Sequence, residues 1–322
     1  MSELRLGWWL SSEEHDPRHL VEHAQLAQSV GFPTAMLSDH LLPWVRRQGH
    51  AGHAWTTLGA IAQATDTLEV GTGVTAMVHR NHPIDVAHAA ATAAVLLEGR
   101  FFLGVGSGER LNEQPFGERW PRPGERRERL REAILVLRML AEDKNANHRG
   151  DHFNVENLRF TIRPAAKPPV YVAAGGKRTA ELAGELGDGL IMVTPDSKLV
   201  ATYRGAGGQG PCLAQVHISM ADTMDDAVEN AWRWWPNGGI SSPLLAELAR
   251  PQHFEAVAET TRRESIHETV VCATEPGPVI TAIDRFIGAG CDTVYIHQIG
   301  PDQQRLADMA RDELLPHYQS AA

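Results

Sequence analysis

Residues that can transfer protons recur along this chain, each placed directly after an apolar run. Glu13 follows the first run, and Asp39 and His40 follow the second. Glu109 follows a later run, and Trp44 lies four residues beyond His40. Carboxylates and imidazoles are the usual general acids and bases, and an indole offers a flat apolar surface. Together these residues predict proton transfer beside a planar ligand, if the fold brings them to one site.

The stretch from Phe101 to Glu109 joins a possible strand to a possible site. Its first half is continuously apolar, as expected for a strand buried on both faces. Its second half alternates glycine with other residues, and glycine allows positive φ and close approach of the backbone to a ligand. By itself the stretch is better explained by a glycine-rich turn with a solvated Glu109, and the case for a site depends on other strand ends repeating the arrangement.

A second glycine pair, Gly175 and Gly176, lies between an apolar run and a predicted helix that begins with Lys177 and Arg178. Free N–H groups and the helix dipole favour a phosphate at such a position, and an ordinary turn is the alternative. Neither glycine stretch matches GxGxxG, which disfavours a nicotinamide site of the Rossmann type. His50 and His53 have no evident third ligand, so no metal site is predicted.

These residues can form one site only if the fold brings the ends of several strands together. The hydrophobic pattern of the chain predicts such a fold. Apolar strand-like runs alternate with amphipathic helical stretches from end to end. The predicted strands are Leu4–Trp9, Thr34–Ser38, Leu68–Val74, Arg100–Val105, Val170–Ala173, Leu190–Val193, Cys212–Met220 and Thr293–His297, with a brief extended piece at Thr269–Ala273. The predicted helices include Pro17–Val30, Trp55–Ala64, one opening at Pro83, Glu125–Glu142, Lys177–Leu186, Asp225–Trp235, Glu275–Gly288 and Asp302–Leu315.

This count predicts a single α/β domain over residues 1–322, a (β/α)8 TIM barrel, in which polar residues after the strands share one rim. Insertions are expected after strands 4 and 7, at about 143–168 and 236–267, the first of them irregular. A doubly wound open sheet is the alternative, but no convincing linker divides the chain. The tryptophans at 232, 234 and 235 are interpreted as helix packing rather than as a pocket wall.

The amino-acid composition limits the kinds of molecule that this protein is expected to bind. The chain has 322 residues, 43% of them hydrophobic, and a net charge of −10 without a free basic cluster, which argues against nucleic acid. No apolar run approaches a membrane span, and the segment from Met1 to Arg5 lacks signal-peptide features. The three cysteines are scattered. A cytoplasmic protein acting on a small molecule is expected.

The motifs resemble the luciferase-like superfamily of TIM-barrel flavin and deazaflavin enzymes along nearly the whole chain. The branch of the F-420-dependent glucose-6-phosphate dehydrogenases is the most similar. The resemblance rests on Leu6-Gly7 with Glu13, Ser38-Asp39-His40 with Trp44, Gly71-Thr72, Pro83, Phe102 through Glu109 with Leu111-Asn112-Glu113, Val172 through Gly176, and Gly187-Asp188-Gly189.

The resemblance implies coenzyme F-420 as the cofactor and a homodimer as the assembly. The deazaflavin ring would lie against a bulge at Gly73-Val74, commonly with a non-proline cis peptide, and Asp39 would hydrogen-bond it. His40 would be the base on a substrate hydroxyl and Glu109 the proton partner of the ring, while Trp44 and Glu13 orient the substrate. The other expected cofactor contacts are Ala76, Gly106, Ser107, Gly108 and Asn112, with Ala174, Gly175 and Gly176 at the tail phosphate. The branch tends to carry serine and threonine where this chain has Gly73 and Ala76.

The positions at which this chain departs from the pattern of the branch concern the binding of the substrate. Sugar-phosphate members hold the phosphate with a threonine, two lysines and an arginine, and only Lys198 keeps its type here. The threonine falls at Val193 or Thr194, the second lysine at Ala256 and the arginine near Thr269. Because charge-assisted hydrogen bonds contribute about 1.5–3 kcal/mol each, losing two cations disfavours glucose 6-phosphate.

The expected activity is therefore hydride transfer between F-420 and a non-phosphorylated alcohol or sugar. Three alternatives stay open: a reductase that uses reduced F-420 on an activated ring such as a nitroaromatic, an FMN-dependent monooxygenase, and a non-catalytic cofactor-binding barrel. Intact proton-transfer residues argue against the last, because binding alone does not require them.

Overall fold

The computed structural model describes residues 4–319, so Met1–Glu3, which begin the segment inspected for a signal peptide, and residues 320–322 lie outside the description. Eight parallel strands close into a barrel in the order β1, β2, β3, β5, β8, β9, β10 and β12, and β12 pairs again with β1. Their bounds are Arg5–Leu10, Thr34–Leu37, Glu69–Thr72, Phe101–Gly106, Val170–Ala173, Gly189–Met192, Cys212–Met220 and Thr293–Gln298. The predicted TIM barrel is confirmed.

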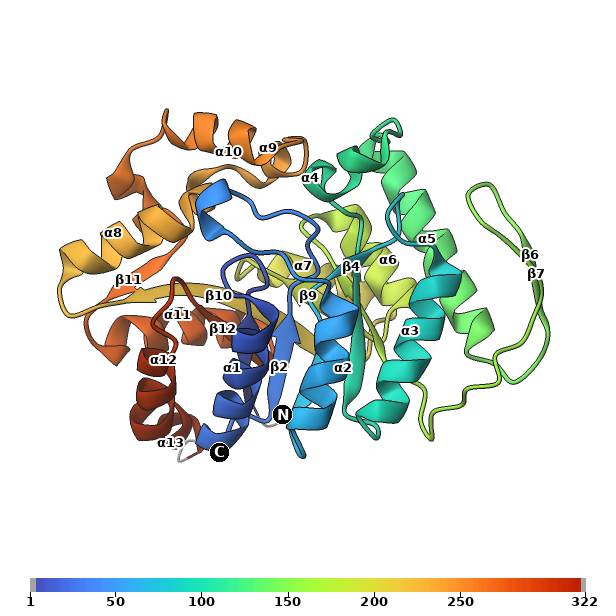
Figure 1. Cartoon of the computed structure of the whole chain (residues 1–322), viewed down its shortest axis with the longest axis horizontal. Coiled ribbons are helices and arrows are strands. Elements are labelled where there is room, and N and C mark those ends of the chain that lie inside the picture. Colours follow the sequence, from blue (N-terminus) through green and yellow to red (C-terminus); the bar gives the residue numbers. More distant parts are fainter. Residues whose placement is uncertain (1–3, 320–322) are drawn as a thin grey trace.

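Helices surround the barrel (Figure 1). They are α1 (Pro17–Val30), α2 (Ala54–Ala64), α3 (Pro83–Leu96), α4 (Arg110–Glu113), α5 (Pro123–Leu140), α6 (Lys177–Leu186), α7 (Ser197–Gly205), α8 (Met224–Trp234), α9 (Ser242–Leu245), α10 (Pro251–Ala258), α11 (Pro276–Ala289), α12 (Gln304–Met309) and α13 (Leu315–Gln319). Within the described residues no helix is long and apolar enough to cross a membrane.

The barrel interior is filled by large side chains that glycines accommodate. Phe102 and Tyr295 pack there with Trp9, Met36, Ile191 and Leu213. A Cβ at Gly7 would lie 2.4 Å from the Tyr295 ring, and one at Gly71 would lie 2.2 Å from the Phe102 ring. Because these strand positions are glycine, the aromatic rings fill the space, and the barrel is a packed core rather than a pore.

Helix α1 shows how local sequence sets the element bounds. The Asp16 carboxylate accepts hydrogen bonds from the N–H groups of Arg18 and His19, and Pro17 occupies the first helical turn. At the other end Gly31 adopts φ of 102°, the left-handed conformation that closes many helices. The predicted bounds Pro17–Val30 agree with the structure for this reason.

Four segments differ from the expectations. The predicted strand Leu68–Val74 is shorter in the structure, where β3 ends at Thr72, and the short β4 (Thr75–Ala76) follows it and pairs with β5. The segment expected to be irregular after α5 contains an antiparallel hairpin of β6 (Ala146–Arg149) and β7 (Asn154–Leu158). Helix α7 was not expected. The predicted helix at 302–315 begins later, at Gln304, and contains a π segment, Ala310–Leu314.

The insertion predicted at 236–267 forms short helices, including α9 and α10. In Figure 1 these helices lie together with α4 and α8 at the upper end of the molecule, whereas α13 lies at the lower end. They pack through Phe254 against Trp44, in a cluster that also holds Leu111 and Trp235. The insertion therefore forms part of the wall beside the carboxyl ends of the strands. β11 (Val271–Ala273) then pairs with the end of β10.

Candidate active site

The loop after β1 carries five successive buried polar residues, Ser11 through His15. Glu13 lies in its middle and is 2% exposed. Its carboxylate accepts hydrogen bonds from the hydroxyls of Ser11, at 3.2 Å, and of Ser38, which follows β2. Burial raises the pKa of Glu13, but nearby His40 and the Ser38 hydroxyl outweigh it, so the pKa lies below its usual value.

His40 lies between the two acids predicted to accompany it. Its Nε2 is 3.5 Å from Glu13 Oε1 and 3.8 Å from Glu109 Oε2. The imidazole is 8% exposed and packs on the Trp44 ring, with the ring centroids 4.8 Å apart. Glu109 precedes α4 and keeps 37% of its side chain exposed, so it faces solvent as well as His40. The fold thus brings Glu13, His40, Trp44 and Glu109 together from three different strand ends.

Asn112 makes side-chain contacts with several parts of this group. Its side-chain Oδ1 accepts hydrogen bonds from the backbone N–H groups of Leu41, at 2.9 Å, and Leu42. Its Nδ2 is therefore turned toward Glu109 Oε2, at 3.2 Å, and His40 Nδ1, at 3.3 Å. In this structure Asn112 positions the proposed acid and base.

Asp39 forms a buried ion pair with Arg80, a residue that the sequence did not suggest. Arg80 Nη2 lies 2.6 Å from Asp39 Oδ1, and the Thr75 hydroxyl donates to Oδ2 at 2.7 Å. A carboxylate has about four acceptor positions, so Asp39 keeps capacity for further donors. Glu113, also buried, accepts from the N–H groups of His79 and Arg80, and burial raises its pKa.

The bulge between β3 and β4 lies beside the glycines that follow β5. The Gly73–Val74 peptide is cis, as the resemblance implied. A Cβ at Gly106 would lie 2.6 Å from Val74 Cγ2, and Gly108 adopts φ of +75° with Ala76 close to it. Gly106 and Gly108 therefore let the bulge pack closely against β5, and Ser107 lies between them.

The second glycine pair has different surroundings. Gly175 and Gly176 precede the ten-residue helix α6 and are exposed, and a Cβ at either would meet nothing within 4 Å. Lys177 and Arg178 are also exposed at the start of this helix. Ala174 is buried, and its N–H donates to Ile191 O. This helix end is exposed, and a phosphate at it stays a prediction.

A further set of polar residues at the barrel mouth was missed. Glu14 Oε2 lies 2.5 Å from His297 Nε2, and His297 Nδ1 lies 2.9 Å from His217 Nδ1. Trp235 packs on both imidazoles, so of the three tryptophans that were interpreted as helix packing, this one lies against site residues. The available signal was the alternation of side-chain direction along the strands Cys212–Met220 and Thr293–Gln298. It places His217 and His297 on the faces that point into the barrel.

The positions aligned with a phosphate site are exposed and belong to different segments of the chain. Val193 is 51% exposed after β9, Lys198 is exposed on α7, Ala256 is exposed on α10, and Thr269 is exposed before β11. His53 Nδ1 lies 3.0 Å from the Thr56 hydroxyl. Within residues 4–319 no group of three or more histidine, cysteine, aspartate or glutamate side chains is arranged to hold a metal ion.

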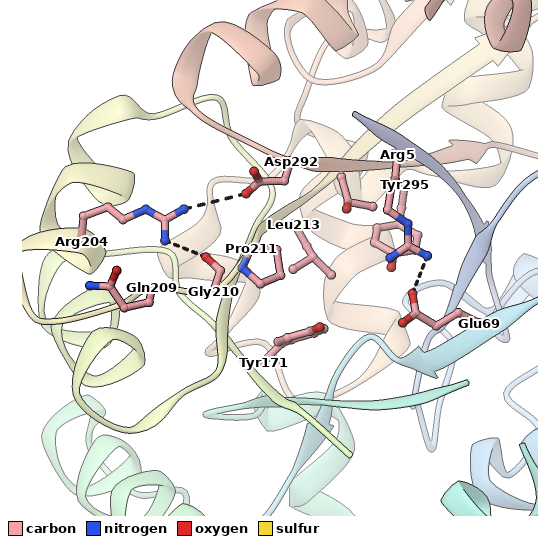
Figure 2. Close-up of a pocket in the computed structure, with 11 residues that line it drawn as sticks. Arg5, Glu69, Tyr171, Arg204, Gln209, Gly210, Pro211, Leu213, Asp292 and Tyr295 are labelled. Atoms are coloured by element: carbon pink, nitrogen blue, oxygen red, sulfur yellow. Dashed lines mark hydrogen bonds and ion pairs between the residues drawn. The ribbon is translucent and has the colours of Figure 1, made fainter. Parts of the chain in front are cut away.

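A cavity of about 390 Å³ opens at the opposite end of the barrel (Figure 2). It lies at the beginnings of the strands, where Arg5 pairs with Glu69 at 2.8 Å and Arg204 lies 3.9 Å from Asp292. TIM-barrel active sites lie at the carboxyl ends of the strands, and no proton-transfer set comparable to His40 lines this cavity. We therefore assign the site to the mouth rather than to this cavity.

Parallel strands closing into a barrel, with acids, an imidazole and an indole on the carboxyl rim, define the class as a TIM-barrel enzyme. Residues 3–292 match the family model of the luciferase-like monooxygenases. The chain belongs to the luciferase-like monooxygenase family.

Three relatives refine this placement. An F-420-dependent glucose-6-phosphate dehydrogenase from Amycolatopsis mediterranei is 32% identical, over 97% of this chain and 98% of the relative. An F-420-dependent hydroxymycolic acid dehydrogenase from Mycobacterium tuberculosis is 35% identical, over 97% of this chain and 87% of the relative. The structure of an F-420-dependent secondary alcohol dehydrogenase, bound to an F-420–acetone adduct, superimposes with a TM-score of 0.90 at 28% identity, covering 96% of this chain and 98% of that one. The predicted kinship with F-420-dependent oxidoreductases is confirmed.

Proposed function

We propose that this protein is an F-420-dependent dehydrogenase that oxidises a neutral alcohol or sugar to a carbonyl compound. The observation that carries the proposal is the buried His40 imidazole, with Nε2 within 4 Å of both Glu13 and Glu109 on the barrel rim. A base within hydrogen-bond reach of a substrate hydroxyl is what alcohol oxidation requires.

Two features fit F-420 as the cofactor. The open start of α6 at Gly175-Gly176, with Lys177 and Arg178 beside it, suits the tail phosphate. The bulge at Gly73-Val74, with Asp39 held by Arg80 and Thr75, suits a planar ring that needs an additional hydrogen-bond acceptor. When bound, F-420 supplies an acceptor for the hydride.

The residues of the site then have different roles in the reaction. His40 takes the hydroxyl proton of the alcohol at Nε2, and the Glu13 carboxylate stabilises the imidazolium that results. Asn112 holds Glu109 through Nδ2 and the Leu42 backbone through Oδ1, and Leu42 O in turn accepts from His40 Nδ1–H. Trp44 packs against the imidazole, with the two rings tilted by 52°. Glu109, which is partly exposed, exchanges protons between the cofactor side of the site and solvent.

The charge at the mouth favours a neutral substrate. Glu13, Glu14 and Glu109 add negative charge, and the nearby Arg80 is already paired with Asp39. Of the four positions aligned with a sugar-phosphate site, only Lys198 is a cation. The names of two relatives, a hydroxymycolic acid dehydrogenase and a secondary alcohol dehydrogenase, agree with a hydroxyl substrate that carries no phosphate.

The reverse reaction is a second candidate, because the imidazolium that oxidation leaves on His40 is the proton donor that reduction needs. His40 Nδ1 lies 3.2 Å from Leu42 O, a contact that Nδ1–H makes both in the neutral base and in the imidazolium. Glu13 and Glu109 beside Nε2 stabilise that cation. A reductase acting on a carbonyl or an activated ring would use the imidazolium as its acid.

Cofactor titration tests the proposal first. We expect F-420 to bind at micromolar concentration or tighter and FMN and NADP to bind negligibly, as measured by visible absorbance and native mass spectrometry. Saturation by FMN and not by F-420 would instead support the monooxygenase alternative. Oxidation of isopropanol, propylene glycol and glucose 6-phosphate, followed by deazaflavin absorbance, then tests the substrate class. Native mass spectrometry also tests the expected homodimer.

A further inference from the structure

The second acid–imidazole group at the mouth consists of Glu14, His297 and His217, and is called the relay below. Glu14 follows β1, directly after Glu13, and accepts a hydrogen bond from the Gly300 N–H at 2.9 Å. Its other oxygen meets His297 Nε2 at 2.5 Å, and His297 Nδ1 meets His217 Nδ1 at 2.9 Å. The three side chains therefore form one continuous hydrogen-bonded line.

The first member sets the direction of the line when His297 is a neutral imidazole. An ionised carboxylate only accepts, so the single proton of neutral His297 lies on Nε2, and its Nδ1 keeps a lone pair. His217 then donates through Nδ1–H and keeps a lone pair at Nε2. Burial keeps the pKa of His217 well below its usual value, so this imidazole stays neutral.

The far end of the relay faces the barrel mouth. Leu213, four residues before His217 on β10, packs inside the barrel, and strand residues four apart share a face. His217 pairs in register with His297, which follows the interior Tyr295 by two residues. His217 is the one residue of β10 that is not fully buried. Its exposed part therefore lies on the interior side, near the carboxyl end of the strand.

The relay is adjacent to the proposed base. Glu13, which faces His40, and Glu14, which faces His297, are consecutive residues of one buried loop. Trp235 packs on His217 and His297 with centroid separations of 5.2 and 4.6 Å, which restricts their rings. One loop thus fixes two imidazoles at the same mouth, one beside each carboxylate.

We infer that the relay holds His217 as a fixed hydrogen-bond acceptor for a second hydroxyl of the substrate, beyond the hydroxyl that reacts at His40. This rests on the proposed function and narrows the substrate class to neutral compounds with at least two hydroxyl groups. His217 touches the substrate, whereas Glu14 and His297 are positioning residues.

Nitrogen-15 NMR of the histidine side chains tests the relay without any turnover. At neutral pH we expect His217 to carry its proton on Nδ1 and to have an unprotonated Nε2. Glu14→Gln should disturb this tautomer. Propylene glycol should shift the Nε2 resonance, whereas isopropanol, which lacks the second hydroxyl, should not. A protonated Nε2, or equal shifts with both alcohols, overturns the inference.

Steady-state oxidation of the same two alcohols tests the effect on specificity. For propylene glycol we expect His217→Phe to raise KM about 10-fold, the loss of one hydrogen bond, with kcat little changed. For isopropanol KM should stay unchanged. His217→Gln, which offers an amide oxygen, should restore part of the diol preference. His88→Phe on the exposed side of α3 is the matched control.

The two proposals fail in different ways. If F-420 does not bind, the proposed function is wrong, while the tautomer and the diol-dependent shift are still measurable in the free protein. If F-420 binds and His217→Phe changes KM equally for both alcohols, the inference is wrong and the proposed function stands.

Discussion

At the N-terminal end of the barrel, Arg5 and Glu69 pair at 2.8 Å beside an open cavity, whereas at the mouth Glu13 and Glu109 flank the imidazole of His40. The first end pairs permanent charges of opposite sign, which need no further partner. The second end places carboxylates around an imidazole, a group that can accept and donate a proton during a reaction. The presence of a cavity is therefore a poor guide to the active site. Side chains that can exchange protons with a substrate are a better one.

The largest effect should come from removing the base at the mouth. We expect His40→Ala to lower the turnover of an alcohol by about 10²–10⁴-fold, because the hydroxyl proton loses its acceptor. F-420 affinity should change little. Steady-state oxidation and a cofactor titration measure the two quantities, and His88→Ala serves as the control. Full alcohol activity in His40→Ala would remove His40 from the mechanism.

The phosphate turn offers the next test. Gly176→Val places side-chain atoms where nothing lies within 4 Å, so folding should be unaffected. The added atoms obstruct the approach of a phosphate to the start of α6, and F-420 affinity should fall at least about 10-fold, as for a lost charge-assisted hydrogen bond. A tail-less deazaflavin should bind as before. Gly205→Val, at another open glycine, is the control, and equal losses for both ligands would contradict the assignment.

A buried histidine at the barrel mouth should also make the free energy of unfolding depend on pH. Burial lowers the pKa of His15 to about 4, so between pH 6.5 and 4 the unfolded chain binds the proton that the folded chain excludes. The free energy of unfolding should therefore decrease as pH falls, by up to about 1.4 kcal/mol per pH unit for this group. Urea unfolding of His15→Gln should show a shallower slope, whereas His267→Gln on the surface should not. An unchanged slope in His15→Gln would refute this.

The smallest effect is expected at the N-terminal cavity. Arg5 and Glu69 expose 42% and 27% of their side chains, so their ion pair is well solvated. Arg5→Ala should lower the free energy of unfolding by only about 0.2–1 kcal/mol and leave alcohol turnover unchanged. Denaturant titration and the same oxidation assay measure both. A large loss of turnover would mean that the two ends of the barrel are coupled.

Much of the scaffold was predictable because its signals are local. Pro17 and Gly31 bound α1, and the continuous apolar run at Phe101–Val105 indicates a doubly buried strand. The hairpin at β6 and β7 and helix α7 were missed, because their sequences are polar and carry weak periodicity. The grouping of Glu13, His40 and Glu109 followed from the barrel rule that strand ends share one rim.

The order of residues along the chain thus determined the barrel, the acids and imidazole on its rim, and the open glycine turn at Gly175-Gly176. Only the tertiary structure decided which partners these groups have. The pairing of Asp39 with Arg80, and of Glu14 with His297 and His217, joins residues up to 283 positions apart. Such pairs depend on strand register and on side-chain direction across the closed barrel, which no local pattern encodes.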